Sequence, residues 1–173
     1  MDDPYLNIQI STQISLVPEQ LNVSDIYNEI KSELIRIYEK KCNKYGFIDK
    51  IYKIDKYSNG NIVAEDFTGD IIIDVTYSCR LCYPKIESVL HCKIQKINKS
   101  FITAEYGPVV LIIELNNINK EKFKLDQNKD LVILDNNNII AINDIISVKI
   151  LQIDFNNNDS EMIAIGYLEN YIK

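Results

Sequence analysis

Polar and apolar residues alternate at the start of the chain. Between residues 6 and 16 the even positions are apolar except for one threonine, and the odd positions are polar. The apolar positions are Leu6, Ile8, Ile10, Ile14 and Leu16. A period of two predicts a β-strand with one buried face. Because Pro18 lacks the amide hydrogen that a strand ladder needs, we expect the strand to end there.

After Pro18 the apolar period becomes that of a helix. The stripe consists of Ile26, Ile30, Leu34 and Ile37. This spacing predicts an amphipathic helix of about four or five turns. Asn22 or Ser24 is a suitable N-cap. Lys40 and Lys41 would lie in the last turn, where cations offset the partial negative charge of unpaired carbonyls, and Gly46 would follow as the helix stop.

The rest of the first half has the composition of antiparallel strands. Residues 47–57 are rich in aromatic and β-branched side chains, and Asn59-Gly60 is the typical signal of a tight hairpin. Ile71, Ile73 and Val75 mark a further strand. We therefore predict a small antiparallel sheet with one main helix across a face, which makes the chain an α+β protein.

The second half has only strand-like patterns. Pro84 marks the boundary, because a proline restricts both its own residue and the preceding one, so we expect two domains, residues 1–83 and 84–173. The apolar runs after Pro84 are Val89 to Ile97, Ser100 to Tyr106, Val109 to Leu115, Leu131 to Ile142, Ile145 to Phe155 and Met162 to Leu168. Short strands separated by turns at such intervals predict a small β-barrel.

Composition narrows the class of protein. The chain has 173 residues, of which 46% are hydrophobic and 25% charged, and its net charge is −6. This charge disfavours a protein that coats duplex DNA by electrostatic attraction alone. No run of eighteen apolar residues and no basic, then apolar N-terminus is present, so we expect neither a membrane span nor a secretory signal, and an intracellular protein. Its four cysteines are too few for a dense disulfide framework, and we expect reduced thiols.

The order of several motifs resembles one known family. After the strand that ends at Pro18 and the helix come EKKCNKYGFI (39–48), GDIIIDVTYSCRLCYPKIESVL (69–90), EYGPVVLII (105–113) and IAIGYLENYIK (163–173). Together they resemble the seventh-subunit family of multi-subunit RNA polymerases, a family that includes an archaeal counterpart. Two positions depart from the family's glycines: Lys41 before the cysteine, and Glu87 after the interdomain proline.

The resemblance implies a fold and a role. It implies a truncated RNP-like tip domain that docks on the polymerase core, followed by an OB-fold that meets nascent single-stranded RNA. A fourth-subunit-like partner would complete a stalk that supports transcription initiation, without an active site or cofactor in this chain. By the same analogy, the core-facing end of the tip would carry Pro18, Asn22, Asn59 and Gly60.

The source affects the expected location. The short length and the many Asn and Ile residues suit a large DNA virus or an AT-rich protist. We expect a nuclear protein if the source is cellular, and a protein of the virion or the cytoplasmic virus factory if it is viral.

The predicted barrel offers a candidate RNA-binding face. OB barrels bind single strands through a basic groove and aromatic platforms. By strand alternation, the outward-facing candidates are His91, Lys93, Lys99, Phe101 and Lys149. The alternative is an ordinary solvated face with one aromatic residue that contacts a partner subunit.

The cysteines raise the question of zinc. Cys79 and Cys82 have a spacing found in zinc sites, and His91 and Cys92 are possible further ligands. Adjacent strand residues point to opposite faces, so His91 and Cys92 do not converge easily on one metal. We therefore expect buried structural thiols and no metal site.

Nothing in the chain predicts catalysis: His91 is the only histidine, and no phosphate-cradling glycine loop is present. Two other functions stay open. One is a free-standing OB-fold factor that binds single-stranded RNA unaided, and the other is a purely structural interaction protein that binds no RNA even at low salt.

Overall fold

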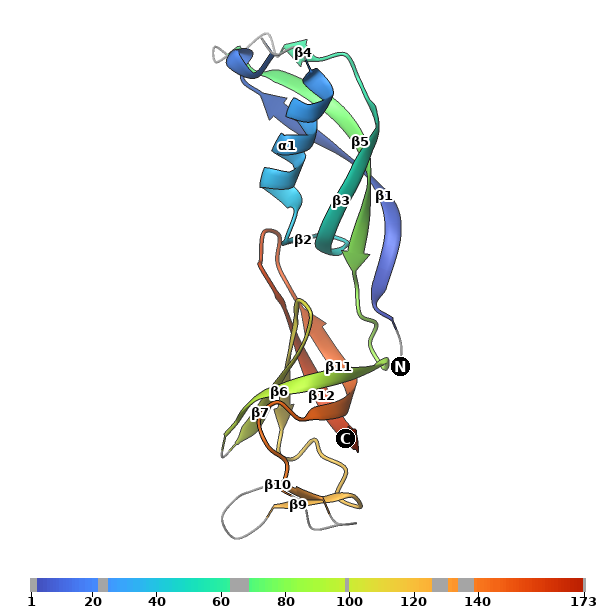
Figure 1. Cartoon of the computed structure of the whole chain (residues 1–173), viewed down its shortest axis with the longest axis vertical. Coiled ribbons are helices and arrows are strands. Elements are labelled where there is room, and N and C mark those ends of the chain that lie inside the picture. Colours follow the sequence, from blue (N-terminus) through green and yellow to red (C-terminus); the bar gives the residue numbers. More distant parts are fainter. Residues whose placement is uncertain are drawn as a thin grey trace. The chain divides into compact units, whose positions relative to one another are not determined.

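Contacts divide the chain into two compact units. A computed structural model describes residues 3–21, 25–62, 69–98, 100–125, 131–133 and 139–172. The first unit, here called the sheet unit, is Tyr5–Cys82, and the second, the barrel unit, is Tyr83–Lys173 together with Met1–Pro4. Figure 1 shows that the helix α1 belongs to the sheet unit and that strands form most of both units. The predicted α+β class is confirmed.

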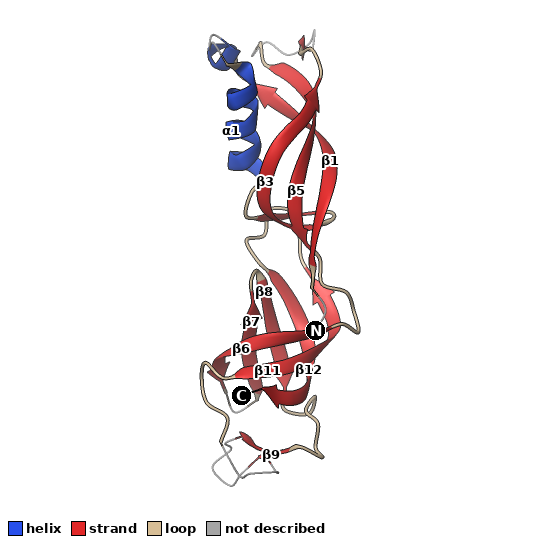
Figure 2. Ribbon diagram, turned by 45° about the vertical axis from the view of Figure 1, so that its right-hand side comes forward, coloured by secondary structure: helices blue, strands red, loops and turns tan. Residues whose placement is uncertain are grey.

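The sheet unit is a five-stranded antiparallel sheet with α1 on one face (Figure 2). Its elements are β1 (Tyr5–Leu16), the short 3-10 helix η1 (Pro18–Leu21), α1 (Ile26–Tyr38), β2 (Lys41–Asn43), β3 (Gly46–Tyr57), β4 (Asn61–Ile62) and β5 (Ile71–Cys82). The strand order is β1-β5-β3-β2, and β4 also pairs with β5. The predicted stripe is confirmed, because Ile30 and Leu34 are fully buried and Ile26 and Ile37 pack against the same core.

The ends of α1 differ from the prediction. Asp25 is the N-cap and accepts a hydrogen bond from the Asn28 amide at 3.2 Å, whereas Asn22 and Ser24 lie outside the described residues. The helix ends at Tyr38, so Lys40 and Lys41 do not lie in its last turn. Lys40 makes the turn with a left-handed φ of 61°, after which Lys41 begins β2 opposite Ile48.

Gly46 is not the helix stop. It begins β3 after a two-residue turn that joins β2 to β3, with a φ of 137°.

The pairing of β3 with β5 is bulged at regular intervals. Register shifts follow Ile48, Ile51 and Ile54, so three residues of β3 oppose two residues of β5 at each step. These three isoleucines therefore all face α1, and each is buried. A bulge leaves a backbone group outside the ladder. Here the Ile51 amide donates to Glu39 Oε2 at 2.8 Å, and the Ile54 amide donates to the Tyr27 hydroxyl at 3.2 Å.

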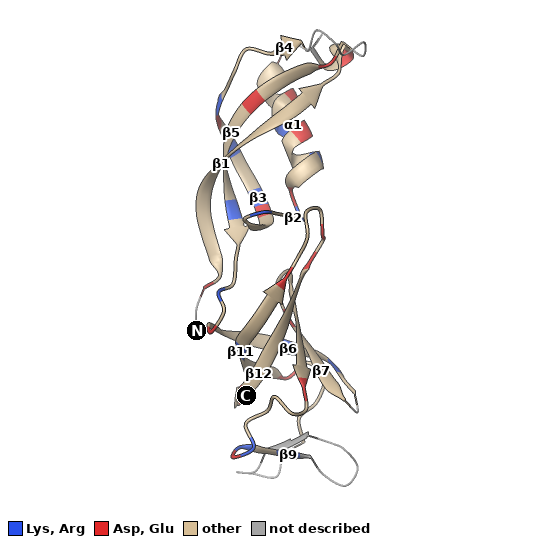
Figure 3. Ribbon diagram, turned by 180° about the vertical axis from the view of Figure 1, so that it is seen from behind, with Lys and Arg blue, Asp and Glu red and all other residues tan. Residues whose placement is uncertain are grey.

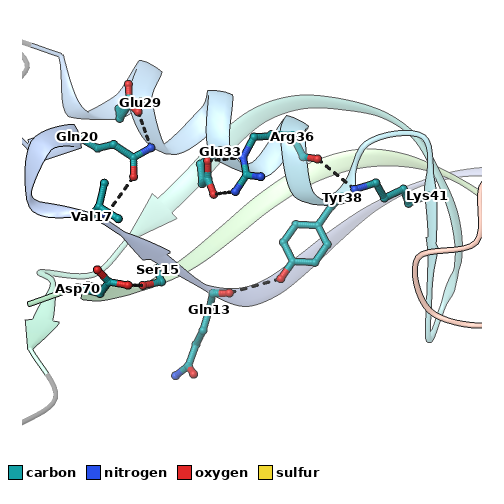
Figure 4. Close-up of polar contacts among 10 residues, drawn as sticks. All are labelled: Gln13, Ser15, Val17, Gln20, Glu29, Glu33, Arg36, Tyr38, Lys41 and Asp70. Atoms are coloured by element: carbon teal, nitrogen blue, oxygen red, sulfur yellow. Dashed lines mark hydrogen bonds and ion pairs between the residues drawn. The ribbon is translucent and has the colours of Figure 1, made fainter. Parts of the chain in front are cut away.

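Polar contacts also tie α1 to η1 and β1 (Figure 4). Gln20 accepts a hydrogen bond from the Val17 amide at 3.0 Å and donates to Glu29 at 2.8 Å. Glu33 is buried, and Arg36 Nε donates to its carboxylate at 2.9 Å. This bond from Arg36 lowers the pKa of Glu33 below its ordinary value, against the opposing effect of burial. The helix thus keeps a charged pair at the edge of the core.

The predicted tight hairpin at Asn59-Gly60 is wrong. Ser58 exchanges hydrogen bonds with Asp74, and Asn61 lies opposite Ile72, so β4 continues along β5 in the direction of β3. The chain reverses between Ile62 and Ile71. A reversal of the chain at Asn59-Gly60 would have left the start of β5 paired with β1 alone.

The barrel unit is built on a closed five-stranded barrel, which confirms the predicted barrel. Its strands are β6 (Val89–Ile97), β7 (Phe101–Tyr106), β8 (Val109–Glu114), β11 (Ile145–Asp154) and β12 (Met162–Ile172). They follow the order β11-β12-β8-β7-β6, and β6 pairs with β11 to close the ring. Only β12 and β8 are parallel neighbours. The barrel interior holds Leu90, Cys92, Ile94, Ile102, Ala104, Ile146, Val148 and Ile150, as the alternation predicts.

The predicted barrel strand from Leu131 to Ile142 is wrong. Of this range the structure describes residues 131–133 and 139–142. Leu131–Ile133 form a strand, β10, which pairs with β9 (Phe123–Leu125) in a separate two-stranded sheet, and residues 139–142 lie outside the strands. The ring closes without this segment, because β12 pairs directly with β8.

The amide of Ile54 gives a direct test of the bulged pairing. In Tyr27→Phe the ring stays and only the hydroxyl is lost, so a largely buried amide loses its acceptor. We expect a loss of about 1–3 kcal/mol in the free energy of unfolding, measured by urea denaturation. Tyr45→Phe is the control, since Tyr45 is exposed, and should change stability by less than about 0.5 kcal/mol. Equal stability of Tyr27→Phe and the parent would show that this bond does not support the bulge.

Candidate nucleic-acid and partner surfaces

The candidate RNA-binding residues all occur on outward positions of the barrel, where the structure describes them. Lys93 on β6 is exposed, and His91 on β6 and Lys149 on β11 are half-buried. Phe101, the first residue of β7, is 37% exposed. Lys99 lies outside the described residues.

The register separates these residues into two places. Lys149 lies opposite Val89, at the start of β6, whereas the carbonyl of Phe101 accepts from the Asn98 amide, just beyond the end of β6. A strand rises about 3.3 Å per residue, so the two candidates are separated by about 30 Å along β6. His91 and Lys93 lie opposite Ser147 and Ile145 and therefore belong with Lys149. Phe101 is at the other end of β6.

Carboxylates accompany the cations of this group. Lys149 forms an ion pair with Glu87, which raises the pKa of Lys149. Lys93 lies opposite Glu105 on β7. The first lysine is already paired, and the second has an acidic cross-strand neighbour. The outer surface here is mixed in charge, as Figure 3 also shows for the barrel strands.

Glu87 occupies a position where the resemblance expects glycine. Its φ is 71°, a left-handed conformation that glycine adopts without strain. Its amide donates to the Ile150 carbonyl at 2.8 Å and its carboxylate binds Lys149. The first barrel strand therefore begins normally at Val89 despite the missing glycine.

An apolar surface surrounds Phe101. Strands β7, β8 and β12 are neighbours, and their outward positions include Ile112 beside Ile165 and Val110 beside Ile163. Ile163 is 48% exposed, whereas Val110, Ile112 and Ile165 are half-buried, so this surface is partly open to solvent within the described structure. At the Phe101 end an open hollow of about 490 Å³ is lined by Ser100, Phe101, Ile112, Glu114, Leu115 and Asn116. We call Phe101, Val110, Ile112, Ile163 and Ile165 the apolar wall.

The candidate docking residues of the sheet unit share one end of the sheet. Pro18 follows β1, whose last residue Leu16 lies opposite Ile71. Asn59 and Gly60 precede β4, whose residue Ile62 also lies opposite Ile71. These two segments therefore flank β5 on either side at its start. Asn22 lies outside the described residues.

Exposed apolar side chains lie at the same end of the sheet. Ile62 is 65% exposed and Val17 is 41% exposed. A single exposed isoleucine is ordinary, but two such residues beside an exposed proline form a small surface suited to protein contact.

All four cysteines are buried thiols, which confirms this part of the prediction. Burial raises the pKa of Cys79 to about 11 and that of Cys92 to about 12. Cys79 belongs to the sheet unit and Cys92 to the barrel unit. Among the described residues, no three His, Cys, Asp or Glu side chains are grouped closely enough to hold a metal ion. In the same part of the chain, no helix is long and apolar enough to cross a bilayer.

The chain has a relative among the subunits of viral RNA polymerases. No family model matches it. A protein of Acanthamoeba polyphaga mimivirus, named "Putative DNA-directed RNA polymerase subunit L376", is 31% identical over 164 residues. The match covers 95% of this chain and 81% of the relative. The chain belongs to the family of this viral RNA polymerase subunit.

The apolar wall is the surface that sequence reasoning missed in this family member. Residues 109–113 of β8 are apolar at every position, and a run without alternation is typical of a strand covered on both faces. The inner positions Val109, Leu111 and Ile113 fill the barrel. The outer positions Val110 and Ile112 are half-buried, so the run without alternation was the signal of this outer apolar surface.

The buried thiols predict slow chemical modification. At about pH 8 a thiol with a raised pKa is protonated and a buried one is out of reach, so Ellman's reagent should label the native protein at least about 100-fold more slowly than the unfolded protein. Ser160→Cys is the control, because Ser160 is exposed and its thiol should react at once. Rapid labelling of the native parent would contradict burial. Release of zinc on unfolding, read with a metallochromic indicator, would contradict thiols without a metal.

Proposed function

We propose that the chain is a non-catalytic stalk subunit of a viral DNA-directed RNA polymerase, of the seventh-subunit type. The mimivirus relative supports this proposal most, because the match extends over 95% of the chain and so includes both units. The order of the two units, a helix-covered sheet followed by a barrel, agrees with the architecture that the resemblance implies. The viral relative also favours a location in the virion or the virus factory.

The barrel is proposed to be an OB-fold. Numbered along the chain, its five strands are adjacent in the order 1-2-3-5-4 and back to 1, with strands 3 and 5 parallel. A five-stranded Greek-key barrel of this kind is the OB-fold arrangement. Nascent single-stranded RNA is its proposed ligand, at His91, Lys93, Lys99 and Lys149, whereas Phe101, which lies at the other end of β6 and opposite Glu114, is proposed to contact a protein partner.

The apolar wall is proposed to bind the fourth-subunit-like partner. Barrel strands with apolar outer positions are stable in water only when little of that surface is exposed, and Ile163 is about half exposed. The rim of this surface contains Glu105 and Glu114. A partner with a matching apolar face and basic residues at its edge fits these charges.

The end of the sheet that carries Pro18, Asn59 and Gly60 is proposed to dock on the core enzyme. Val17, Pro18 and Ile62 supply apolar contact area there, and Asn59 and Gly60 lie between β3 and β4 at the same end. Through these two contacts the chain would join the core to the stalk partner and support initiation.

A matched pair of substitutions separates the two contacts. Ile62→Asp and Ile163→Asp each place a charge at an exposed isoleucine, one in each unit. We expect Ile62→Asp to lower co-purification of the large polymerase subunits about tenfold or more, equivalent to about 1.4 kcal/mol. Ile163→Asp should lower capture of a small partner by a similar factor. The measurement is quantitative mass spectrometry of proteins bound to the tagged chain in its native host.

Unchanged thermal unfolding of both variants is the control for folding. If the parent never associates with large polymerase subunits, the proposed function is wrong. A monomer that binds RNA without such subunits would instead favour the free-standing OB-fold factor. If the parent associates and both variants do so equally well, the two docking surfaces are wrongly assigned.

A further inference from the structure

The basic residues of the chain are concentrated in one segment. Residues 36–56 contain seven of the 19 Lys and Arg residues and three carboxylates, a local net charge of +4 in a chain of net charge −6. The seven are Arg36, Lys40, Lys41, Lys44, Lys50, Lys53 and Lys56. The last three lie on β3 and are all exposed. A local excess of this size attracts anions even when the whole protein is acidic.

The bulges of β3 place these three lysines in one row. Lys50, Lys53 and Lys56 pair with Arg80, Ser78 and Thr76 of β5. The intervening β5 residues, Cys79 and Tyr77, are buried beneath α1, so the three lysines lie on the opposite, open face of the sheet. Successive lysines are separated by two β5 residues, about 6.7 Å. This interval is comparable with that between successive phosphates of an extended single strand.

The row retains positive charge after its ion pairs are counted. Asp49 binds both Lys40, at 2.6 Å, and Arg80, at 3.6 Å. Asp55 binds Lys53 at 3.2 Å.

Other carboxylates leave an excess of cations. Asp74 on β5 is a further carboxylate of this face, and it accepts from Gln13 at 2.9 Å. The five cations Lys40, Lys50, Lys53, Lys56 and Arg80 therefore outnumber Asp49, Asp55 and Asp74. Asp70 lies beyond them, just before the start of β5, and accepts from Ser15 at 3.2 Å. Among the described residues, no carboxylate is within ion-pair distance of Lys50 or Lys56. Figure 3 shows basic positions in blue on these strands of the sheet unit.

An exposed aromatic ring lies within the row. Tyr52 is a bulge residue between Lys50 and Lys53, and its side chain is 43% exposed. It lines a shallow hollow of about 290 Å³ together with Asn7, Ile8, Gln9, Ser78 and Cys79. The ring offers a stacking surface, and the Asn7 amide offers hydrogen bonds to the edge of a base. The Gln9 amide and the Ser78 hydroxyl donate to Asp55, at 3.2 and 2.6 Å.

We propose that the open face of the sheet unit binds single-stranded nucleic acid, with phosphates along Lys50, Lys53 and Lys56 and a base stacked on Tyr52. Cations that follow a backbone beside an aromatic platform are the two parts that single-strand binding requires. An ordinary solvated face would also carry lysines, but a half-exposed tyrosine in a hollow between the lysines is not expected there. Arg80 extends the row, although its guanidinium also lies 4.0 Å above the Tyr5 ring.

This site is distinct from the RNA contact proposed for the barrel, and it does not depend on assembly with a polymerase. The test therefore uses the purified full chain. Fluorescence anisotropy with a labelled single-stranded oligouridylate, at several salt concentrations, measures the binding. The parent should bind at low salt and lose affinity as salt rises, because phosphate contacts release counterions.

Charge removal tests the lysine row. The triple variant Lys50→Gln, Lys53→Gln, Lys56→Gln keeps the side-chain length and removes three charges. We expect at least about a tenfold loss of affinity at low salt, and a slope of log K against log salt that is shallower by about 2. The matched control is Lys120→Gln, Lys122→Gln, Lys124→Gln on the barrel unit, outside the RNA contact proposed for the barrel, which should bind nearly as the parent does. Thermal unfolding checks that both variants are folded.

Tyr52 tests the aromatic platform. Tyr52→Ala should weaken binding about five- to 100-fold, the range for loss of one stacked base. Tyr52→Phe keeps the ring and should bind within about twofold of the parent. A duplex of the same length should bind less tightly, since a paired base cannot stack on the ring.

Three results would overturn the proposal. In the first, the parent does not bind the oligonucleotide at low salt. In the second, the triple variant of Lys50, Lys53 and Lys56 binds as tightly as the parent. In the third, Tyr52→Ala binds as tightly as the parent. Loss of binding in the barrel control alone would place the site on the barrel. None of these results concerns co-purification with polymerase subunits, so the proposed function is tested separately.

Discussion

The bulged pairing of β3 with β5 is the constraint on which the sheet unit depends. Three residues of β3 advance for every two of β5, so Ile48, Ile51 and Ile54 reach the core at a spacing that a regular strand does not allow. The same register turns the amides of Ile51 and Ile54 toward acceptors on Glu39 and Tyr27. Core packing, helix docking and the lysine row on the other face all follow from this one pairing.

Closure of the barrel depends on a different constraint, the parallel contact of β12 with β8. Next to the residues that pair with β8, Gly166 of β12 pairs with Ile150 of β11, where a Cβ atom would lie 2.3 Å from Val148 Cγ1. The absence of a side chain lets β12 pass over the filled interior and reach both neighbours. Since β12 takes the place beside β8, the segment between β8 and β11 is left outside the ring, where its strands β9 and β10 pair with each other.

The sequence predicted the elements whose period matches their final environment. The stripe of α1 and the inward residues of β6, β7 and β11 were correct. The alternation of β1 was correct from Ile8 to Leu16, whereas Leu6 is 46% exposed. Errors arose where long-range pairing decides the structure. Asn59-Gly60 has the local chemistry of a hairpin, yet β5 offered a partner for β4. Leu131 to Ile142 is apolar enough for a barrel strand, yet the ring was already complete. The lysine row was not predicted, because side chains on one face of a regular strand recur every two residues, whereas Lys50, Lys53 and Lys56 recur every three.

The two units differ in the kind of partner that their surfaces suit. On the barrel, Phe101 lies among aliphatic residues and beside Glu114, an environment that repels phosphate and favours contact with protein. On the sheet unit, Tyr52 lies between Lys50 and Lys53 and beside two amides, and the Asp55 carboxylate nearby is paired with Lys53. This environment favours phosphate and an exposed base. An aromatic side chain on a β-sheet therefore does not identify a nucleic-acid site by itself. The charge of the neighbouring side chains distinguishes the two cases, and it supports the proposals of protein contact for Phe101 and nucleic-acid contact for Tyr52.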